Sequence, residues 1–263
     1  MVRRSDDALI LRRFRFGESS LIVHVATAEH GRLHLLAKGA YRPTARFYAA
    51  LDLFDTLHLD WQESPGRDLS NLHAATIVTR RHRIAFDLER YRAALTVLEL
   101  VDLVLQSGSN NAELFSLSRS ALDQLASAVE PAQVLIEFEL AFLQNLGLGP
   151  ALLECASCAG PAPASGPRGA PRAAFSAQCG GRLCADCAAE ARAIGRRVGT
   201  LPEAILREAA RLAPQAASQS SAAPAEVSLL HVRDAVARFV EYQLQGRPKS
   251  YRTFLQAPQR NAP

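Results

Sequence analysis

The first 80 residues alternate between apolar and polar positions in short runs, which is the pattern of β-strands buried on one face. Leu57, Leu59 and Trp61, for instance, are each separated by one polar residue. Segments rich in Gly, Ser and Pro separate the runs, as turns require. The pattern predicts five strands, over residues 8–16, 21–27, 32–38, 51–61 and 69–79. Closing a short sheet removes its exposed edges, so we predict a small five-stranded β-barrel, and strands and loops of this length fit the OB type best.

After residue 83 the apolar residues recur about every 3.6 positions, which is helical spacing. This period predicts helices over residues 86–105, 114–125, 132–146, about 201–212 and 229–244. Thr200 and Glu203, with Pro202 between them, have the form of a capping box that begins the fourth helix. The predicted fold class is therefore α+β, with an OB-type barrel over residues 1–80 followed by an α-helical domain over residues 81–263.

Charge is distributed unevenly along the chain, although the formal net charge is only +4. Residues 1–83 carry 13 Lys and Arg against 9 Asp and Glu, residues 84–154 carry 3 against 10, and residues 155–263 carry 14 against 7. Basic segments attract phosphate polymers, which favours a nucleic-acid partner for the two ends. The alternative is a solvated surface in an arginine-rich protein, because 28 of the 30 basic residues are Arg.

All five cysteines lie between residues 155 and 187. Cys155 and Cys158 form one Cys-x2-Cys pair, Cys184 and Cys187 form another, and 25 residues separate the two pairs. Two such pairs can supply four thiolates to one tetrahedral zinc ion. Four thiolates leave no position open for water, so we predict a structural Zn2+ in a zinc-ribbon-like module at about residues 153–190, inserted in the helical domain.

Other uses of the cysteines stay open at this point. The alternatives are two disulfides, redox chemistry and unligated thiols, and Cys179 is either a replacement ligand or a spare thiol. A cytoplasmic location argues against disulfides. A thioredoxin-like redox motif requires a βαβ unit, and the surrounding sequence predicts none.

The sequence favours a binding protein over an enzyme. It contains no phosphate-binding Gly-rich loop and no metal-binding His motif, and six of the seven His lie in the first 83 residues. His24 and His34 stand at strand spacing, so we interpret them as side chains on a barrel face. We expect most of the helical carboxylates to lie on solvated faces, namely those of Glu99, Asp102, Glu137 and Glu139.

Location and mobility follow from apolar length and composition. Arg12 and Arg13 interrupt the N-terminal apolar run, and no stretch approaches the roughly 20 apolar residues of a membrane span. We therefore expect a cytoplasmic protein without a membrane contact. The polar Ala, Ser, Gln and Pro tract at about residues 213–226 predicts a flexible loop.

Basic residues are interleaved with aromatic ones in and after the first strands. Charge follows a nucleic-acid backbone and rings stack on bases, so this mixture suits single-stranded nucleic acid. Arg13 and Arg15 share one strand face by the two-residue period, and Arg12 faces the other way. The alternative is that Phe47 and Tyr48 are core residues and that the arginines only solubilise the barrel. The candidate DNA-binding residues are Arg12, Arg13, Arg15, Arg32, Lys38, Arg42 and Arg46.

Five segments together resemble RecO, the bacterial recombination mediator family. They are ALILRR at residues 8–13, FGESSL at 16–21, EHGRLHLLAKGA at 29–40, FSAQCGGRLCADC at 175–187 and KSYRTFL at 249–255. Their order and spacing cover nearly the whole chain. RecO-like proteins have an OB barrel, a helical domain and, in many members, a zinc site of two Cys-x2-Cys pairs. In this chain the ligands implied are Cys155, Cys158, Cys184 and Cys187, while Cys179 departs from the family pattern and leaves an exchange with Cys184 open.

The resemblance implies a role in DNA repair and recombination. RecO-like proteins bind single- and double-stranded DNA, anneal complementary strands, bind RecR and the C-terminal tail of the single-strand-binding protein SSB, and help to load RecA onto SSB-coated DNA in the RecF pathway. Such a protein acts at the nucleoid and hydrolyses no nucleotide. An acidic SSB tail needs an apolar slot ringed by cations, for which Arg233 and Arg238 are candidates. The alternative function is a zinc-containing protein–protein adaptor without direct DNA activity.

Overall fold

The computed structural model describes residues 2–42, 47, 50–63, 66, 68–108, 111–127, 129–167, 170–214 and 227–251. The chain divides into two compact units, Met1–Val129 and Glu130–Pro263. Most of the predicted flexible loop, residues 215–226, lies outside the described residues. Within the described part of the chain, no helix has the length and apolar character needed to cross a membrane.

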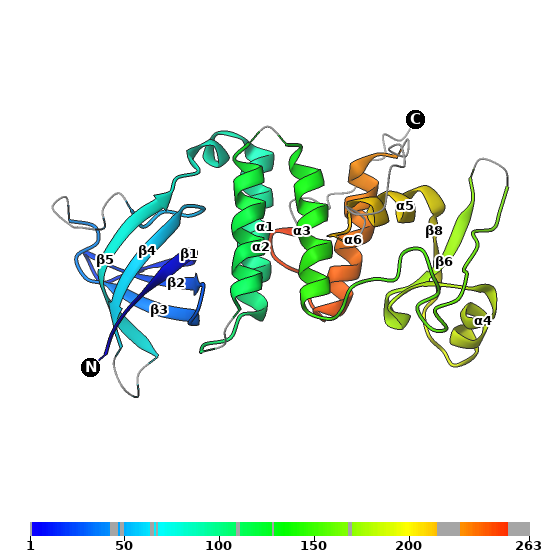
Figure 1. Ribbon diagram of the computed structural model, residues 1–263, viewed down its shortest axis with the longest axis horizontal. Coiled ribbons are helices and arrows are strands. Elements are labelled where there is room, and N and C mark those ends of the chain that lie inside the picture. Colours follow the sequence, from blue (N-terminus) through cyan, green and yellow to red (C-terminus); the bar gives the residue numbers. More distant parts are fainter. Residues whose placement is uncertain are drawn as a thin grey trace. The chain divides into compact units, whose positions relative to one another are not determined.

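The first unit begins with a closed five-stranded barrel (Figure 1). Its strands are β1 (Arg3–Phe16), β2 (Ser20–Thr27), β3 (Gly31–Ala37), β4 (Thr56–Gln62) and β5 (Leu69–Thr79). Around the barrel they follow the order β1-β2-β3-β5-β4, and β4 pairs with β1 to close it. All pairs are antiparallel except β3 with β5. The predicted OB-type barrel and α+β class are confirmed.

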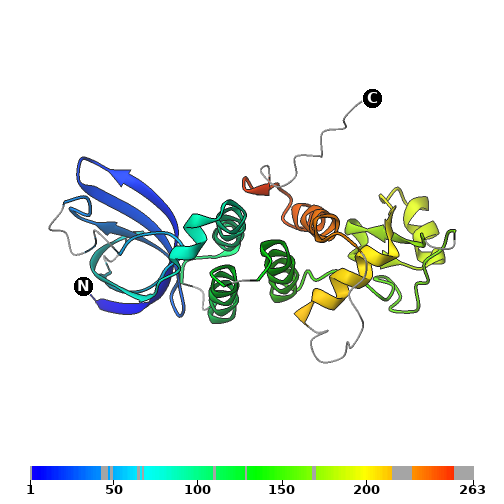
Figure 2. The same cartoon turned by 90° about the horizontal axis from the view of Figure 1, so that it is seen from above.

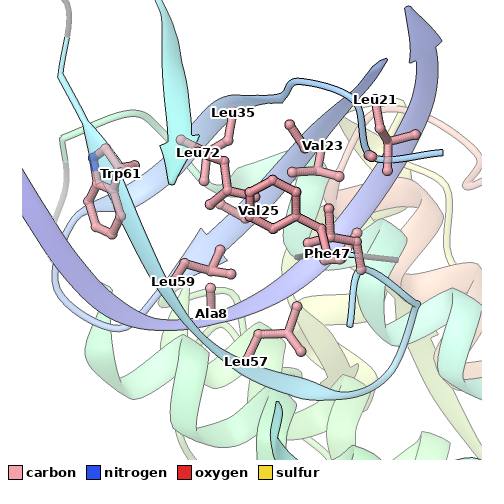
Figure 3. Packing of buried hydrophobic residues seen from close by; sticks show 14 residues of the cluster. Ala8, Leu21, Val23, Val25, Leu35, Phe47, Leu57, Leu59, Trp61 and Leu72 are labelled. Carbon is pink, nitrogen blue, oxygen red and sulfur yellow. The ribbon is translucent and has the colours of Figure 1, made fainter. Parts of the chain in front are cut away.

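Alternation places one face of each strand inside the barrel. Leu57, Leu59 and Trp61 are fully buried, and their side chains converge with those of Val23 and Leu35 from the opposite strands (Figure 3). β1 begins at Arg3, five residues before its predicted start, because the segment Arg3–Leu9 pairs with β4. The polar side chains of this segment concealed its strand character, which is set by pairing rather than by burial of alternate residues.

Two helices complete the first unit, α1 (Leu88–Val104) and α2 (Ala112–Leu125), after the 3-10 turn η1 (His82–Phe86). They run side by side in both views (Figures 1 and 2). The compact unit therefore extends well past the predicted domain boundary at residue 80. Arg81 provides the physical reason: its buried guanidinium donates to the Phe54 carbonyl at 2.7 Å and to Asp123 of α2 at 2.7 Å, which joins the barrel to the helix.

The second unit combines helices with a three-stranded sheet of order β7-β6-β8. Helix α6 packs against α3 and α5 (Figure 2). The elements are α3 (Pro131–Asn145), β6 (Arg172–Ser176), η2 (Ala177–Cys179), β7 (Gly181–Leu183), α4 (Ala185–Ala193), β8 (Gly199–Pro202), α5 (Glu203–Leu212) and α6 (Leu229–Gln243). The strands and α4 were not predicted, because strands of three to five residues are too short to show a period of two.

The predicted capping box is wrong, and α5 begins at Glu203 rather than directly after Thr200. Thr200 lies in β8, where its hydroxyl accepts a hydrogen bond from Arg172 at 2.9 Å. The Glu203 carboxylate binds the buried Arg182 at 2.8 Å and Arg207 at 3.0 Å. Both side chains that a capping box requires therefore bind arginines of the second unit instead of the first turn of the helix.

Candidate nucleic-acid interface and metal centre

Two of the candidate DNA-binding arginines hold α1 against the barrel. Arg12 of β1 forms an ion pair with Asp102 of α1, and Arg32 of β3 lies 3.6 Å from the same carboxylate. Arg32 also donates to the Asp102 backbone carbonyl at 3.2 Å. Asp102 is buried, so the expectation that its carboxylate is solvated is wrong. Truncating either arginine would leave the buried Asp102 carboxylate with one neighbouring cation instead of two.

Arg13 and Arg15 lie at the end of the barrel formed by the β1–β2 turn. Arg13 pairs with Val23, and Arg15 pairs with Leu21, across β1 and β2. Residues directly opposite each other in an antiparallel pair point to the same face of the sheet, so both arginine side chains lie on the face that carries the buried Val23 and Leu21. Arg13 donates to the Leu51 carbonyl at 2.9 Å. Arg15 lies with its guanidinium 5.7 Å from the centre of the exposed Tyr41 ring.

Lys38 and Arg42 are exposed in the turn that follows β3. This turn meets the β1–β2 turn, because the backbone N–H of Tyr41 donates to the Ser19 carbonyl at 2.9 Å. Within the described residues, neither Lys38 nor Arg42 forms an ion pair. We call Arg13, Arg15, Lys38 and Arg42 the barrel-end cations. Arg13 pairs with Asp52 at 3.0 Å, so Arg15, Lys38 and Arg42 supply most of the positive charge at this end of the barrel, at a loop that OB folds use to contact nucleic acids.

The aromatic residues of this region separate into exposed and buried ones. Tyr41 is exposed, whereas Phe47 is buried in the barrel core, as the alternative reading proposed for it. Arg46 and Tyr48, the remaining residues of the basic and aromatic mixture, lie outside the described residues. Phe47 is therefore unavailable for base stacking.

A row of three rings, which the sequence pattern did not predict as a site, crosses the outer face of β1–β3. The centroid of the exposed Phe14 ring lies 4.9 Å from that of His24, and the His24 and His34 centroids lie 4.0 Å apart. Burial, and then the neighbouring His34, lower the pKa of His24. At neutral pH, His24 is therefore an uncharged aromatic ring. We call Phe14, His24 and His34 the ring row.

The four cysteines of the two Cys-x2-Cys pairs lie together in the second unit. The sulfur atoms of Cys155, Cys158, Cys184 and Cys187 all lie within 4.8 Å of one another, and those of Cys158 and Cys184 are 4.0 Å apart. A tetrahedral ion with metal–sulfur distances of about 2.3 Å holds its ligands about 3.8 Å apart. The four residues could therefore hold a metal ion with only small adjustments.

Electrostatics within the cysteine group also fit a cation. Burial opposes ionisation of Cys155, but hydrogen bonds from the backbone of Cys184, Cys158 and Ser157 lower its pKa to about 6. The pKa of Cys187 is raised, chiefly by the neighbouring Cys184 thiol. The Cys155 thiolate is thus favoured, whereas the Cys187 thiol is hard to ionise beside the other cysteines. A bound dication would stabilise the Cys187 thiolate as well.

Cys179 lies apart from the group of four. It ends η2, and its sulfur accepts a hydrogen bond from Arg196 at 3.6 Å. The group whose ligand atoms converge contains Cys184 rather than Cys179. Gly181, close by, has a φ of +142° and approaches residue 151 so closely that an added Cβ would lie 2.3 Å from the Ala151 carbonyl oxygen. A side chain at this position would push β7 away from the segment that carries the first Cys pair.

A buried polar cluster lies between α3, α6 and the segment after α6. Arg233 lies 3.0 Å from Glu139, and the Tyr251 hydroxyl donates to the same carboxylate at 2.5 Å. Burial raises the pKa of Glu139 to about 7, while Arg233 and the Tyr251 hydroxyl oppose that rise. Glu139 and Arg233 are 0% and 4% exposed, so the expectation of a solvated Glu139 carboxylate is wrong, and the Arg233 side chain is not available at the surface for an acidic tail. Arg238 is exposed and pairs with Asp234 at 3.0 Å.

Comparison with known proteins identifies two matching family models. The model described as "Recombination protein O N terminal" matches residues 1–81, and the model "Recombination protein O C terminal" matches residues 85–252. A protein of Anaeromyxobacter dehalogenans named DNA repair protein RecO is 34% identical over 256 residues, which cover 97% of this chain and 96% of the relative. A protein of the same name from Myxococcus xanthus is 34% identical over 192 residues, covering 73% of this chain and 75% of the relative.

Proposed function

The chain belongs to the RecO family, and from this membership we propose that it binds single- and double-stranded DNA and anneals complementary strands. A role in DNA repair and recombination comes with the family. The single observation that best supports direct DNA binding is the group of barrel-end cations on an OB-type barrel. OB folds bind oligonucleotides through the face of their second and third strands and through the loop between the first two.

Charge neutralisation explains how such a surface promotes annealing. Two DNA strands repel each other through their phosphates, and cations that contact both strands reduce this repulsion. Lys38 and Arg42 are exposed, and no ion pair within the described residues occupies them. We assign phosphate contacts to these two residues first, and to Arg13, Arg15 and Arg46 with them. Arg12 and Arg32 contribute mainly by holding Asp102, and with it α1, in place.

We propose that the four grouped cysteines bind a structural Zn2+. Zinc favours a closed tetrahedral set of thiolates, and such an ion supplies a cross-link rather than a reactive centre. Here it would join the first Cys pair, which precedes β6 in the chain, to the second pair, which follows β7. Zinc would therefore stabilise the second unit and would take no part in annealing itself.

The proposed cellular role follows the family. We propose that the protein acts in the cytoplasm at the nucleoid, binds RecR and the acidic C-terminal tail of SSB, and helps RecA to load onto SSB-coated DNA. Because Arg233 is buried with Glu139, a receptor for an acidic tail has to use other cations. Exposed Arg238 remains a candidate.

The test is annealing of complementary oligonucleotides, free and SSB-coated, across a salt series. The wild-type protein should accelerate annealing on both substrates. The double variant Lys38→Glu with Arg42→Glu should bind DNA more weakly and with a salt dependence reduced by roughly one to two phosphate contacts. Arg83→Glu is the matched control, since Arg83 is exposed in η1 and carries no assigned role.

Two results would contradict the proposal. Unchanged affinity and salt slope in the double variant would exclude the barrel end as the DNA surface. If the wild-type protein neither bound DNA at low salt nor accelerated annealing, direct DNA activity would be excluded. The adaptor function, with the cysteine-containing unit as its docking module, would then be the better account.

A further inference from the structure

We propose that Phe14, which ends the ring row and packs against His24 and His34, stacks on unpaired bases and makes the barrel prefer single-stranded over double-stranded DNA. This inference rests on the proposed function, because it assigns a second, chemically different part of the same DNA surface. The barrel-end cations recognise phosphates, which both forms of DNA expose. The ring row would recognise base faces, which only unpaired DNA exposes.

The placement of the rings on three adjacent strands supports this assignment. His24 of β2 stands directly opposite His34 of β3, and the centroid distance of 4.0 Å shows that the two rings are in contact. Phe14 of β1 lies diagonally across from His24 at 4.9 Å and is 43% exposed. The planes of His24 and His34 differ by only 32°, so these two rings stack mainly on each other, and Phe14 at the end of the row is the most exposed ring.

Single exposed apolar residues are common on proteins and need no function. The ring row differs because its members touch and because it lies next to cations. Lys38 is the exposed residue directly after β3, four positions beyond His34. A strand whose bases lie on the rings would have Lys38 in position for its phosphates.

The protonation state of His24 suits a ring contact better than a phosphate contact. Burial and His34 lower the pKa of His24, while Asp102 opposes this shift and Arg32 and Arg12 add to it. An uncharged His24 packs beside Phe14 without adding a phosphate-binding charge, and the exposed Phe14 ring can stack on a base independently of sequence, because every base has a π-face. In a duplex those faces are covered by neighbouring bases, so the row has little to bind there.

The experiment measures the Kd of the full chain for an unstructured oligo(dT) and for a duplex of the same length. Phe14→Ala is the main variant, since its side chain is exposed and its loss does not disturb the core. The single-strand Kd should rise roughly ten-fold, as expected for the loss of one stacked base, while the duplex Kd stays the same. The salt slope of single-strand binding should also stay the same, because no phosphate contact is removed.

Further variants separate stacking from structure. His24→Ala should lower single-strand affinity selectively, and His24→Phe, which keeps an aromatic ring, should restore it. Phe86→Ala is the matched control, because Phe86 is 84% exposed and lies in η1 outside the barrel strands. Melting curves of every variant confirm that it is folded before its affinities are compared.

The outcomes distinguish this inference from the proposed function. A selective loss of single-strand affinity with an unchanged salt slope supports the ring row. Equal losses for both DNA forms, or no loss for either in folded Phe14→Ala and His24→Ala, overturn it while DNA binding itself stands. A wild-type protein that binds neither DNA overturns the proposed function as well.

Discussion

The barrel is closed around apolar side chains such as Leu59 and Trp61, whereas the second unit gathers four cysteines at one place and buries Glu139 with Arg233 at another. Apolar burial is spread over many small contributions and depends little on pH or on metal ions. A thiolate group or a buried ion pair concentrates its contribution in a few atoms and responds to both. We therefore expect the two units to respond differently to the same perturbation.

Metal removal should produce the largest difference. Cys155→Ser, or treatment with a strong chelator, should abolish the proposed zinc binding and release the segments joined by the cysteines, since structural zinc sites contribute on the order of 10 kcal/mol. Hydrogen exchange should then increase in β6, β7 and α4 while β1–β5 keep their protection. Cys179→Ser, which lies outside the ligand group, should keep both metal content and protection. Equal metal loss in the two variants would contradict the assignment.

The converse experiment destabilises the barrel. Trp61 is fully buried, so Trp61→Ala should lower the free energy of unfolding of the first unit by about 3–5 kcal/mol through lost burial and a residual cavity. Chemical denaturation followed by circular dichroism measures this change. Phe16→Ala at an exposed position of the same barrel should cost about 0.5 kcal/mol or less. Comparable costs at the two positions would exclude the closed core.

Proton binding should distinguish the units as well. The pKa of Glu139 is raised from 4.5 to about 7, so the folded state binds a proton more tightly than the unfolded state does. The resulting stability is fully present below about pH 4.5 and is lost as the pH rises through about 7, a change on the order of 3 kcal/mol. Glu139→Gln should flatten the pH dependence of urea unfolding in this range. An identical slope in variant and wild type would show that Glu139 does not titrate as described.

The smallest effect is expected at the exposed ion pair on α6. Arg238→Ala should change the free energy of unfolding by only about 0.3–0.5 kcal/mol, because Arg238 and Asp234 pair in solvent. Arg233→Met, five residues earlier in α6, removes the buried partner of Glu139 and should cost more at pH 8 than at pH 5. Thermal unfolding at both pH values measures the contrast. Equal costs for the two arginines would indicate that Arg233 is solvated.

The sequence predicted best those features that repeat along the chain. Alternation over Leu57, Leu59 and Trp61 found β4, and helical spacing found α1, α2, α3, α5 and α6. The cysteine spacing predicted a group of four that the structure brings together. The short elements around the cysteines have too few residues to show any period, and Ala-rich α4 has little amphipathic pattern.

The polar contacts could not be predicted in the same way. Glu139 and Tyr251 are 112 residues apart, and a helical carboxylate has the same local pattern whether it faces solvent or a buried arginine. The ring row is equally non-local, since its members come from three strands and meet only when the register is known. Thr200 and Glu203 show the opposite case, where a local motif was present but stronger tertiary partners used both side chains.

The most direct test of DNA binding by the barrel is hydrogen exchange of the full-length protein with and without saturating oligo(dT). Bound DNA should protect the backbone amides of the β1–β2 turn, residues 17–19, and of the turn after β3, residues 38–42, where the barrel-end cations meet. Protection confined to the second unit, with these two turns unchanged, would contradict the account.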